Sequence, residues 1–526
     1  MAKEKNTKKS RDSGAELQDR LHNIRHSLAH LLAAAVLKKF PDAELGIGPV
    51  IEDGFYYDFK VKGGFTPEDL KEFEKSMRKM IGAKLPFSRK ELKPAELKKF
   101  LAGQPFKKEL YDELKKDPSA SSGQEITFYE TGDVFLDLCR GGHVENTSEI
   151  DPDSFKLDKI AGAYWRSNEK NPQMQRIYGL AFETKKDLDA HLAMLAEAKK
   201  RDHKVLGPAL DLFTFSDLVG SGLPLWTPRG TLIRDMLDAY VWEMRRAHGY
   251  ERVDIPHITK KDLYEKSGHW EKFKDELFKI TTREGHIFAM KPMNCPHHTQ
   301  IYARKQWSYR ELPQRYASTT KVYRDEQSGE LAGLSRVRSI TQDDAHVFCR
   351  KNDIEREMSI IWDIIEKFYK IFGFRLAVRL SLSDPEHQEK YLGTPELWKE
   401  AESTLRNLAI ARSVTTSEAP GEAAFYGPKI DFITKDSLGR TWQVATIQLD
   451  MNMPERFDLY CVNEGGKQER IVMIHAAIMG SIERFTSILI EHTGGHFPLW
   501  LAPTQAVVVP ISETHKKYAE EIRGKL

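Results

Sequence analysis

The sequence predicts a multidomain α+β protein, on three observations. At 526 residues the chain is too long for one hydrophobic core and corresponds to about three to four domains. Helical and strand-like patterns alternate along it, and a highly charged helical stretch separates an N-terminal from a central part. Hydrophobic residues make up 40% and charged residues 30%, which is typical of globular proteins and unlike disordered or fibrous chains.

Composition excludes several other classes of protein. No apolar run approaches the ~18 residues that a membrane helix requires, and the polar, basic N-terminus does not resemble a secretory signal. Only four cysteines occur, and two of them lie close to histidines, which favours metal binding or catalysis in a reducing, cytoplasmic compartment. Lys and Arg (80) nearly balance Asp and Glu (78), so any nucleic-acid surface must be a local patch.

The N-terminal third is expected to form one domain behind a tail. Residues 1–18 are basic and predict a flexible, solvated tail, with an arm that touches nucleic acid as the alternative. A helical apolar period from Leu21 predicts a helix over 19–40, which Pro41 ends. The mixed α/β domain then extends over 19–183, with strand-like segments at 54–61 and 125–130 and a polar turn or insertion at 117–124.

A charged helix over 184–207 is expected to link this domain to the next. The central domain, 208–497, contains a strand pattern at 439–450 and an apolar helix at 476–492 that ends before Gly494. Residues 505–511 predict an apolar strand and 512–526 a helix. One strand and one helix cannot cover both faces of a sheet, so we expect 498–526 to be the beginning of an incomplete domain.

Two short motifs in the N-terminal domain combine histidine and cysteine. HSLAH places His26 and His30 one helical turn apart on the same face. CRGGH presents Cys139 and His143 around two glycines that suit a tight turn. Each pair alone is more often a surface or core feature, but together they indicate a hydrolytic or metal site.

Three further candidates are scattered along the central domain. They are Cys295 in KPMNCPHH, His346 in TQDDAHVFC beside Asp343 and Asp344, and His475 in VMIHAAIMG. Cysteine and histidine are zinc donors. Spacing alone does not join them, and three unrelated buried residues remain the simpler interpretation at this point.

A segment rich in arginine suggests nucleotide chemistry. KVYRDEQSGELAGLSRVRSITQDD predicts two strands and a loop, with Arg324 and Glu326 on one face of the first strand and Arg336 and Arg338 on one face of the second. Arginines on a hairpin can bind a carboxylate and a triphosphate. With Arg484 at the start of an apolar helix in GSIERF, the pattern resembles motifs 2 and 3 of class II aminoacyl-tRNA synthetases, and 248–256 resembles motif 1, their dimer-interface element.

Within that class, KPMNCP, TQDDAH, FYGPKIDF and the HSLAH/CRGGH pair resemble the threonyl-tRNA synthetase family from about Leu21 onward. The resemblance implies an N-terminal α+β editing domain, an antiparallel-sheet catalytic domain and an α/β anticodon-binding domain. It further implies a cytoplasmic homodimer that acts on L-threonine, ATP with Mg²⁺ and tRNA(Thr), holds one Zn²⁺ per chain and clears mischarged seryl-tRNA.

The resemblance also implies the roles of individual residues. The zinc ligands would be Cys295, His346 and His475. The nucleotide contacts would be Arg324, Glu326, Arg336, Gln443 and Arg484, and the amino-acid and adenylate contacts would be Asp344, Tyr426, Lys429 and Gln448. Of these, Arg324, Arg484, Gln448 and Lys429 would be catalytic. The editing site would consist of His26, His30, Lys107, Asp137, Cys139 and His143.

The chemistry of threonine explains why two sites would be needed. A hydrophobic pocket separates substrates that differ by one methyl by only ~1–3 kcal/mol. Zinc with three protein ligands keeps an open position, where threonine can offer its amine and hydroxyl and valine cannot. Serine keeps the hydroxyl, so a second, hydrolytic site must remove it from tRNA.

Three positions depart from the family pattern. Ile340 stands where an aromatic commonly stacks on adenine, Ala476 where arginine is common, and Gly142 where proline is usual. Two rival functions stay open on the sequence: a non-catalytic paralogue that binds RNA, and a deacylase in which only the first domain works. The paralogue would have no reason to keep the paired arginines and the Cys/His set.

Overall fold

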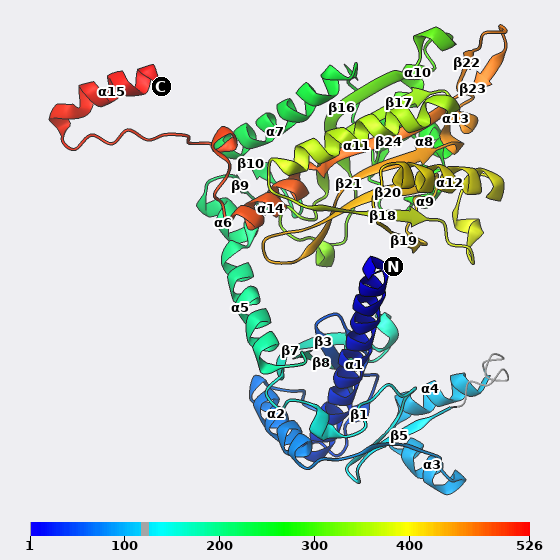
Figure 1. Ribbon diagram of the computed structural model, residues 1–526, viewed down its shortest axis with the longest axis vertical. Coiled ribbons are helices and arrows are strands. Elements are labelled where there is room, and N and C mark those ends of the chain that lie inside the picture. The colour runs from blue at the N-terminus through cyan, green and yellow to red at the C-terminus, as the bar shows by residue number, and fades with distance from the viewer. Residues whose placement is uncertain (1, 117–125) are drawn as a thin grey trace. The chain divides into compact units, whose positions relative to one another are not determined.

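The computed structural model describes the backbone of residues 2–116 and 126–526, and the side chains of these residues except 2–18 and 167. The polar loop expected at 117–124 lies outside the described residues. Two compact units follow one another along the chain, Met1–Leu195 (unit 1) and Ala196–Leu526 (unit 2) (Figure 1). Their boundary falls inside the helix α5 (Lys185–Arg201). No helix in the described part is both long and apolar enough to cross a lipid bilayer.

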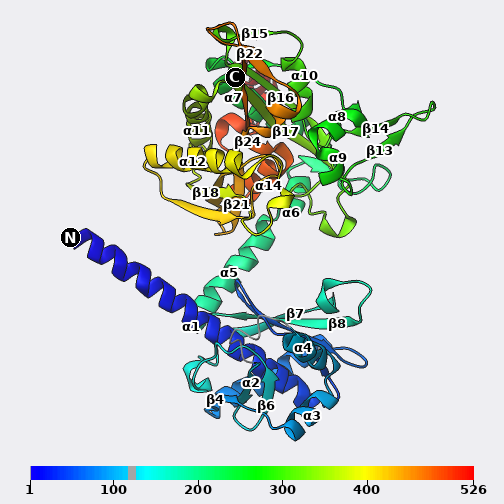
Figure 2. The same ribbon diagram turned by 90° about the vertical axis from the view of Figure 1, so that its right-hand side faces the viewer.

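Unit 1 packs the long helix α1 (Ala2–Lys39) against a five-stranded antiparallel sheet (Figure 2). Leu28 and Leu32 of the helix are fully buried in one core with Phe55 and Tyr57 of the sheet. The strand order is β1 (Glu44–Leu45), β3 (Gly54–Lys60), β8 (Gln173–Ala181) and β7 (Phe155–Tyr164), with β2 (Val50–Ile51) also paired to β3. Strand β3 confirms the strand expected at 54–61.

Helix α1 begins at Ala2, whereas the sequence suggested a helix from about Asp19 behind a tail. The helix therefore starts earlier than the sequence suggested, while the flexible, solvated character expected of residues 1–18 stays a prediction. Lys, Glu, Ala and Arg favour helix, and extending a helix that already exists adds one hydrogen bond per residue without a new nucleus.

A second sheet and three helices complete unit 1. The antiparallel sheet has the order β4 (Phe87–Lys90), β5 (Phe128–Thr131) and β6 (Phe135–Leu138). The helices are α2 (Pro67–Gly82), α3 (Pro94–Ala102) and α4 (Pro105–Lys116). The strand expected at 125–130 thus corresponds to β5.

The charged helix expected over 184–207 is present as two helices, α5 and α6 (His203–Ala209). Asp202 separates them, because its side chain accepts a hydrogen bond from the backbone N–H of Lys204 (2.8 Å) and caps the second helix.

Unit 2 is built on an eight-stranded sheet whose six central strands are antiparallel, with a parallel strand at each edge. The order is β11 (Glu251–Arg252), β16 (Gln314–Tyr323), β17 (Ser339–Cys349), β24 (Val472–Ser481), β21 (Thr441–Asp450), β20 (Lys429–Lys435), β18 (Leu376–Leu382) and β19 (Thr416–Pro420). The strand expected at 439–450 is confirmed as β21.

Helices and small sheets surround this sheet, except the last helix, none of whose residues is buried. The ring of Trp362 on α11 lies 5.0 Å from that of Phe432 on β20, which places α11 on the sheet's core face (Figure 1). The helices are α7 (Pro228–Ala247), α8 (Lys261–Ser267), α9 (His269–Lys272), α10 (Cys295–Tyr302), α11 (Ile354–Lys370), α12 (Pro395–Ala411), α13 (Asn452–Arg456), α14 (Ile482–Thr493) and α15 (Lys516–Lys525). The small sheets pair β9 (Phe213–Thr214) with β10 (Leu225–Trp226), β12 (Ile258–Lys260) with β14 (Ile287–Met290) and β13 (Lys279–Thr281), and β15 (Trp307–Ser308) with β22 (Tyr460–Val462) and β23 (Gln468–Arg470).

Part of the helix expected at 476–492 is a strand. Residues 476–481 belong to β24, which pairs with β17 on one side and β21 on the other. The helix α14 begins only at Ile482, where the Ser481 side chain accepts a hydrogen bond from the N–H of Arg484 (3.1 Å). It ends at Thr493 before Gly494, as the sequence predicted. The two flanking strands form backbone hydrogen bonds with residues 476–481, and the apolar pattern of the sequence alone cannot predict this pairing.

Two expectations about strands were also wrong. Arg324, Glu326, Arg336 and Arg338 lie in the loop 324–338 between β16 and β17, not on the strands themselves. No strand forms at 505–511, where Val507, Val509 and Ile511 are exposed. In the described part of the chain no second strand pairs with that segment, and a strand needs such a partner for its backbone groups.

Candidate functional site

Three side chains expected as metal ligands meet in the interior of unit 2. Cys295 is the first residue of α10, while His346 lies on β17 and His475 on β24. The antiparallel register pairs His346 directly with His475, so both imidazoles lie on one face of the sheet. Their potential ligand atoms and the Cys295 sulfur lie within 4.8 Å of one another, and all three residues are buried. We refer to these three residues as the Cys295 cluster.

The contacts around the Cys295 cluster fit a zinc ion. Nδ1 of His475 lies 3.0 Å from Nε2 of His346, whereas Nε2 of His475 lies 2.9 Å from a carboxylate oxygen of Asp450. A carboxylate on the far nitrogen is a common partner of a metal-bound histidine, because it fixes the ring and its tautomer. Burial raises the pKa of the Cys295 thiol and lowers that of His346. The imidazole is therefore in its ligating form, and a coordinated thiol gives up its proton.

A row of site residues crosses the sheet beside this cluster. Lys429 on β20 pairs with Gln448 on β21, Gln448 pairs with His475, and His475 pairs with His346. Directly opposed residues of antiparallel strands share a face. The register of four strands therefore brings together residues that lie up to 129 positions apart in the sequence.

Asp344 and Tyr426 border the same cluster. Asp344 is two residues from His346 on β17 and shares its face. The Asn294 side chain donates a hydrogen bond to the Asp344 carboxylate (3.1 Å), and burial raises the pKa of Asp344 to about 6. The ring centroid of Tyr426 lies 4.9 Å from that of His475. A carboxylate and a phenol are thus available to an amino-acid substrate beside the metal donors.

The five residues expected to contact the nucleotide line one cavity of about 560 Å³ in unit 2. They are Arg324, Glu326, Arg336, Gln443 and Arg484. A guanidinium nitrogen of Arg336 lies 2.7 Å from a carboxylate oxygen of Glu326. Ile340 lines the same cavity, so apolar contact is available there although aromatic stacking is not. Three arginines around one cavity suit a triphosphate.

The four candidate residues of the HSLAH and CRGGH motifs meet in unit 1. His26 and His30 lie on α1, and the loop after β6 carries Cys139 and His143. Nε2 of His143 lies 3.1 Å from the Cys139 sulfur, and the His143 ring centroid lies 4.2 Å from that of His26 and 4.3 Å from that of His30. We refer to these four residues as the His143 cluster. Their possible ligand atoms also lie within 4.8 Å of one another.

All four groups of the His143 cluster are uncharged near neutral pH. Burial is the largest influence on each of them: it lowers the pKa of His26, His30 and His143. It raises the pKa of Cys139 to about 12. The cluster therefore offers neutral hydrogen-bonding groups rather than a thiolate.

Lys107 and Asp137 form a buried ion pair next to the His143 cluster. Their charged atoms lie 2.6 Å apart, and the hydroxyl of Tyr57 donates a second hydrogen bond to Asp137 (2.6 Å). Burial lowers the pKa of His30 most, followed by the neighbouring His26 and then by the positive charge of Lys107. The pair places one positive and one negative charge side by side next to the cluster, so it adds no net charge there.

The departure at Gly142 has a structural explanation. Gly142 has φ +78° and Gly141 has φ +87°, in the left-handed region that glycine adopts readily. Proline is held near φ −65°, so the proline usual in the family could not take this backbone conformation.

Sequence reasoning missed several residues that support these sites. Asp450 orients His475, and Nδ1 of His298 lies 2.8 Å from Nδ1 of His346. The buried Asp431 accepts hydrogen bonds from Gln443 (2.8 Å) and Ser381 (2.7 Å), and it forms an ion pair with Lys429 (3.2 Å). Each is an ordinary residue within an apolar strand or a histidine-rich motif, so only proximity reveals its role.

Comparison with known proteins agrees with this geometry. The sequence profile of the tRNA synthetase class II core domain (G, H, P, S and T) matches residues 278–493, and that of the threonyl and alanyl tRNA synthetase second additional domain matches residues 126–178. The threonine–tRNA ligase of Gloeobacter violaceus is 48% identical over 517 residues, which span 97% of this chain and 81% of that protein. The chain belongs to the threonine–tRNA ligase family.

Another relative and two solved structures agree with this family assignment. The enzyme of Deinococcus radiodurans is 47% identical over 511 residues, 96% of this chain and 77% of that protein. The crystal structure of the RNA binding domain of threonyl-tRNA synthetase from Cryptosporidium parvum Iowa II matches with TM-score 0.60 and 39% identity, over 62% of this chain and 80% of that chain. A putative threonyl-tRNA synthetase from Aeropyrum pernix matches with TM-score 0.55 and 33% identity, over 62% of this chain and 76% of that chain. The fold is therefore a class II synthetase core preceded by an α+β editing-type domain.

Proposed function

We propose that the chain ligates L-threonine to tRNA(Thr) through a threonyl-adenylate in unit 2 and hydrolyses mischarged seryl-tRNA(Thr) in unit 1. The observation that carries the proposal is the pair of separate clusters in a member of the threonine–tRNA ligase family. Two members of the Cys295 cluster, His346 and His475, lie on the sheet whose strands also line the cavity with the three arginines. The His143 cluster belongs to the other unit. We assign activation to residues 208–497 and editing to residues 19–183.

Cys295, His346 and His475 would hold one Zn²⁺ per chain. When bound, the metal would offer an open coordination position to the amine and hydroxyl of threonine, which valine cannot fill. Mg²⁺ would enter with ATP, as is general for class II synthetases.

The side chains of unit 2 can carry out activation without a covalent enzyme intermediate. Asp344 and Tyr426 would orient the amino acid, while Lys429 and Gln448 on the cross-strand row would contact the carboxylate and the adenylate. Arg324 and Arg484 would spread the negative charge that develops as the carboxylate attacks the α-phosphate. Glu326, Arg336 and Gln443 would position the nucleotide.

The His143 cluster would clear serine by orienting water rather than by binding a metal. His26, His30, Cys139 and His143 are neutral and buried or half-buried, and the charge of the nearby Lys107 is paired with that of Asp137. Neutral imidazoles can hold the terminal ribose and a water molecule at the ester carbonyl. A metal-bound water at the same four residues is the competing mechanism.

We further propose that the protein works as a cytoplasmic homodimer. The edge strand β11 belongs to the segment that resembles the dimer-interface motif of class II synthetases, and an edge strand can pair with a second copy. Analytical ultracentrifugation would test this, since a monomer at micromolar concentration would contradict it.

The test of the function measures three reactions separately: threonine-dependent exchange of pyrophosphate into ATP, charging of tRNA(Thr), and release of serine from seryl-tRNA(Thr). All three should occur. Serine release without exchange would indicate a deacylase, and the absence of all three would indicate a non-catalytic paralogue. Arg336→Ala should raise the KM for ATP, because it removes a cavity arginine, and an unchanged KM would contradict the assigned nucleotide site.

A further inference from the structure

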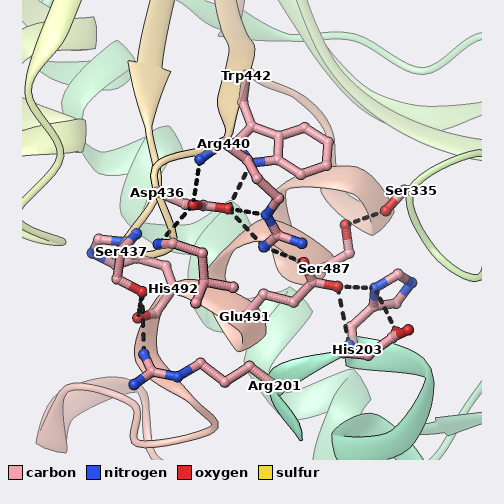
Figure 3. A network of polar contacts seen from close by, with 12 residues as sticks. Arg201, His203, Ser335, Asp436, Ser437, Arg440, Trp442, Ser487, Glu491 and His492 are labelled. Carbon is pink, nitrogen blue, oxygen red and sulfur yellow. Dashed lines mark hydrogen bonds and ion pairs between the residues drawn. The ribbon is translucent and has the colours of Figure 1, made fainter. Parts of the chain in front are cut away.

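A polar network with a buried centre adjoins the nucleotide cavity of unit 2, since its members Ser335 and Trp442 line that cavity. Figure 3 shows the network. At its centre is the carboxylate of Glu491, on α14. One of its oxygens accepts hydrogen bonds from Nδ1 (2.6 Å) and the backbone N–H (3.1 Å) of His203, the first residue of α6. The other oxygen lies 2.5 Å from the guanidinium of Arg440. Both Glu491 and His203 are at least nine-tenths buried.

The network reaches the loop 324–338 through His203. Nε2 of His203 accepts a hydrogen bond from the backbone N–H of Leu334 (3.0 Å), in a turn closed by a bond from Ala332 N–H to the carbonyl of Arg336 (3.2 Å). Nδ1 must therefore carry the proton that is donated to Glu491. Gly333 lies against the ring, since a Cβ there would stand 2.3 Å from Nε2. The same loop carries Arg324, Glu326 and Arg336 to the cavity.

Through Arg440 the network reaches a second segment that lines the cavity, the start of β21. The Arg440 guanidinium also lies 2.6 Å from a carboxylate oxygen of Asp436, and that oxygen accepts a hydrogen bond from the indole N–H of Trp442 (2.9 Å). Trp442 and its neighbour Gln443 line the cavity. Figure 3 shows Glu491 between His203 on one side and the Asp436–Arg440–Trp442 group on the other.

Helix α14 contributes to the cavity directly as well. Arg484, at its start, lines the cavity, and Ser487 lies 2.9 Å from Ser335 of the loop, oxygen to oxygen. Arg484, Ser487 and Glu491 are spaced by three and four residues and therefore share one face of the helix. One helix face thus lines the cavity and contacts the loop, His203 and Arg440.

The same groups do not form a second metal site. Asp202, His203 and Glu491 have possible ligand atoms within 4.8 Å of one another. However, the Asp202 side chain already caps α6, both His203 nitrogens are hydrogen-bonded, and Glu491 is paired with Arg440. Burial acts to raise the pKa of Glu491, but the bonds from His203 and the charge of Arg440 outweigh it and keep the pKa below its ordinary value.

We infer that His203 and Glu491 are positioning residues for the nucleotide site, which hold the Leu334 turn and the Arg440–Trp442 segment at a fixed separation. The inference rests on the proposed nucleotide contacts of Arg324, Glu326 and Arg336. Neither residue touches the cavity, so both act through the backbone and side chains that they hold. ATP binding should depend on them more than threonine binding, because His203 and Glu491 contact the loop and the Arg440 group beside the nucleotide cavity directly. The row reaches this region only indirectly in the described part of the chain, from Gln443 through Asp431 to Lys429.

Two substitutions of His203 separate its two hydrogen bonds. His203→Asn keeps an amide near the Nδ1 position and leaves the Leu334 N–H without an acceptor, whereas His203→Gln places an oxygen near the Nε2 position. In pyrophosphate exchange His203→Asn should raise the KM for ATP about 10-fold and change the KM for threonine less than about 2-fold. His203→Gln should recover most of this loss. His496→Asn, a change at an exposed histidine of the same unit, serves as the matched control.

The outcomes distinguish this inference from the proposed function. Equal behaviour of the Asn and Gln variants, or a parallel change in both KM values with a lower Tm, would overturn the positioning role. If His203→Asn has no effect while Arg336→Ala raises the KM for ATP, the nucleotide site stands and only the inference fails. If the Asn variant does not fold, hydrogen exchange of the unaltered protein decides. A Leu334 amide that exchanges as fast as a solvent-exposed loop amide would contradict its bond to His203.

Discussion

The Cys295 cluster and the His143 cluster contain the same kinds of donor but differ in their surroundings. His475 of the first is held by the carboxylate of Asp450, and the row of strands around it is fixed by backbone pairing. The second lies between a helix and a glycine loop, and its closest charged pair is Lys107 with Asp137. A carboxylate in direct contact with a histidine favours a metal ion on that histidine, whereas the carboxylate beside the His143 cluster is paired with Lys107. We propose that the contacts made by the donors, more than the identity of the donors, decide between a metal site and a water-orienting site.

The largest expected effect is that of Cys295→Ser. Loss of the sulfur should remove the metal and lower the rate of threonine-dependent pyrophosphate exchange by ~10³-fold or more, since a bound metal contributes several kcal/mol. Metal content by mass spectrometry and the exchange rate are measured together.

Cys139→Ser in the other cluster is the matched control for this change. It should leave one zinc per chain. A fall from two metals to one in this variant would show that the His143 cluster also binds metal, which would remove the contrast between the two regions.

The next effect is expected in editing. His30→Ala or Cys139→Ala should slow the release of serine from seryl-tRNA(Thr) by about 100-fold or more, because positioned proton-transfer and water-holding groups contribute that much. Pyrophosphate exchange should stay near its original rate. Parallel loss of both activities with a lower Tm would mean that these residues only pack the unit.

A smaller effect, on metal affinity, is expected from a change at Asp450, which contacts His475 of the Cys295 cluster. Asp450→Asn places an amide opposite Nε2 of His475 and should weaken metal affinity by about 10–100-fold, as loss of an outer carboxylate partner generally does. Competition with a chelator measures the affinity. Asp137→Asn, the corresponding change beside the His143 cluster, should not alter it, and an equal loss in both variants would contradict the comparison.

The smallest effect concerns the pH dependence of stability. Burial lowers the pKa of His143 in the folded state below the ordinary 6.5, so the unfolded chain binds more protons as the pH falls below 6.5. Stability is therefore complete above that pH and decreases below it, by up to ~1.4 kcal/mol per pH unit for each buried histidine. His143→Gln should reduce this slope in denaturation experiments between pH 7 and 5. The same change at the exposed His286 should leave it unaltered, and an unchanged slope in both would contradict the lowered pKa.

Local patterns were sufficient where the chemistry depends on neighbours in sequence. The i,i+4 spacing of His26 and His30 predicted one helix face, and α1 provides it. Gly494 predicted the end of the last core helix, and α14 ends before it. The helix start near residue 476 was wrong, because the strands β17 and β21 on either side of β24 impose an extended backbone that no local pattern encodes.

The sequence by itself determined the family, the residue types of both clusters and the order of the domains, because these are properties of motifs and their succession along the chain. Tertiary structure alone decided which residues complete the sites. Asp450 meets His475, and Glu491 meets His203, only because strand register and helix packing join segments 25 and 288 residues apart. Such contacts depend on long-range backbone pairing and on burial. The spacing of residues along one sequence does not reveal which distant segments will pair.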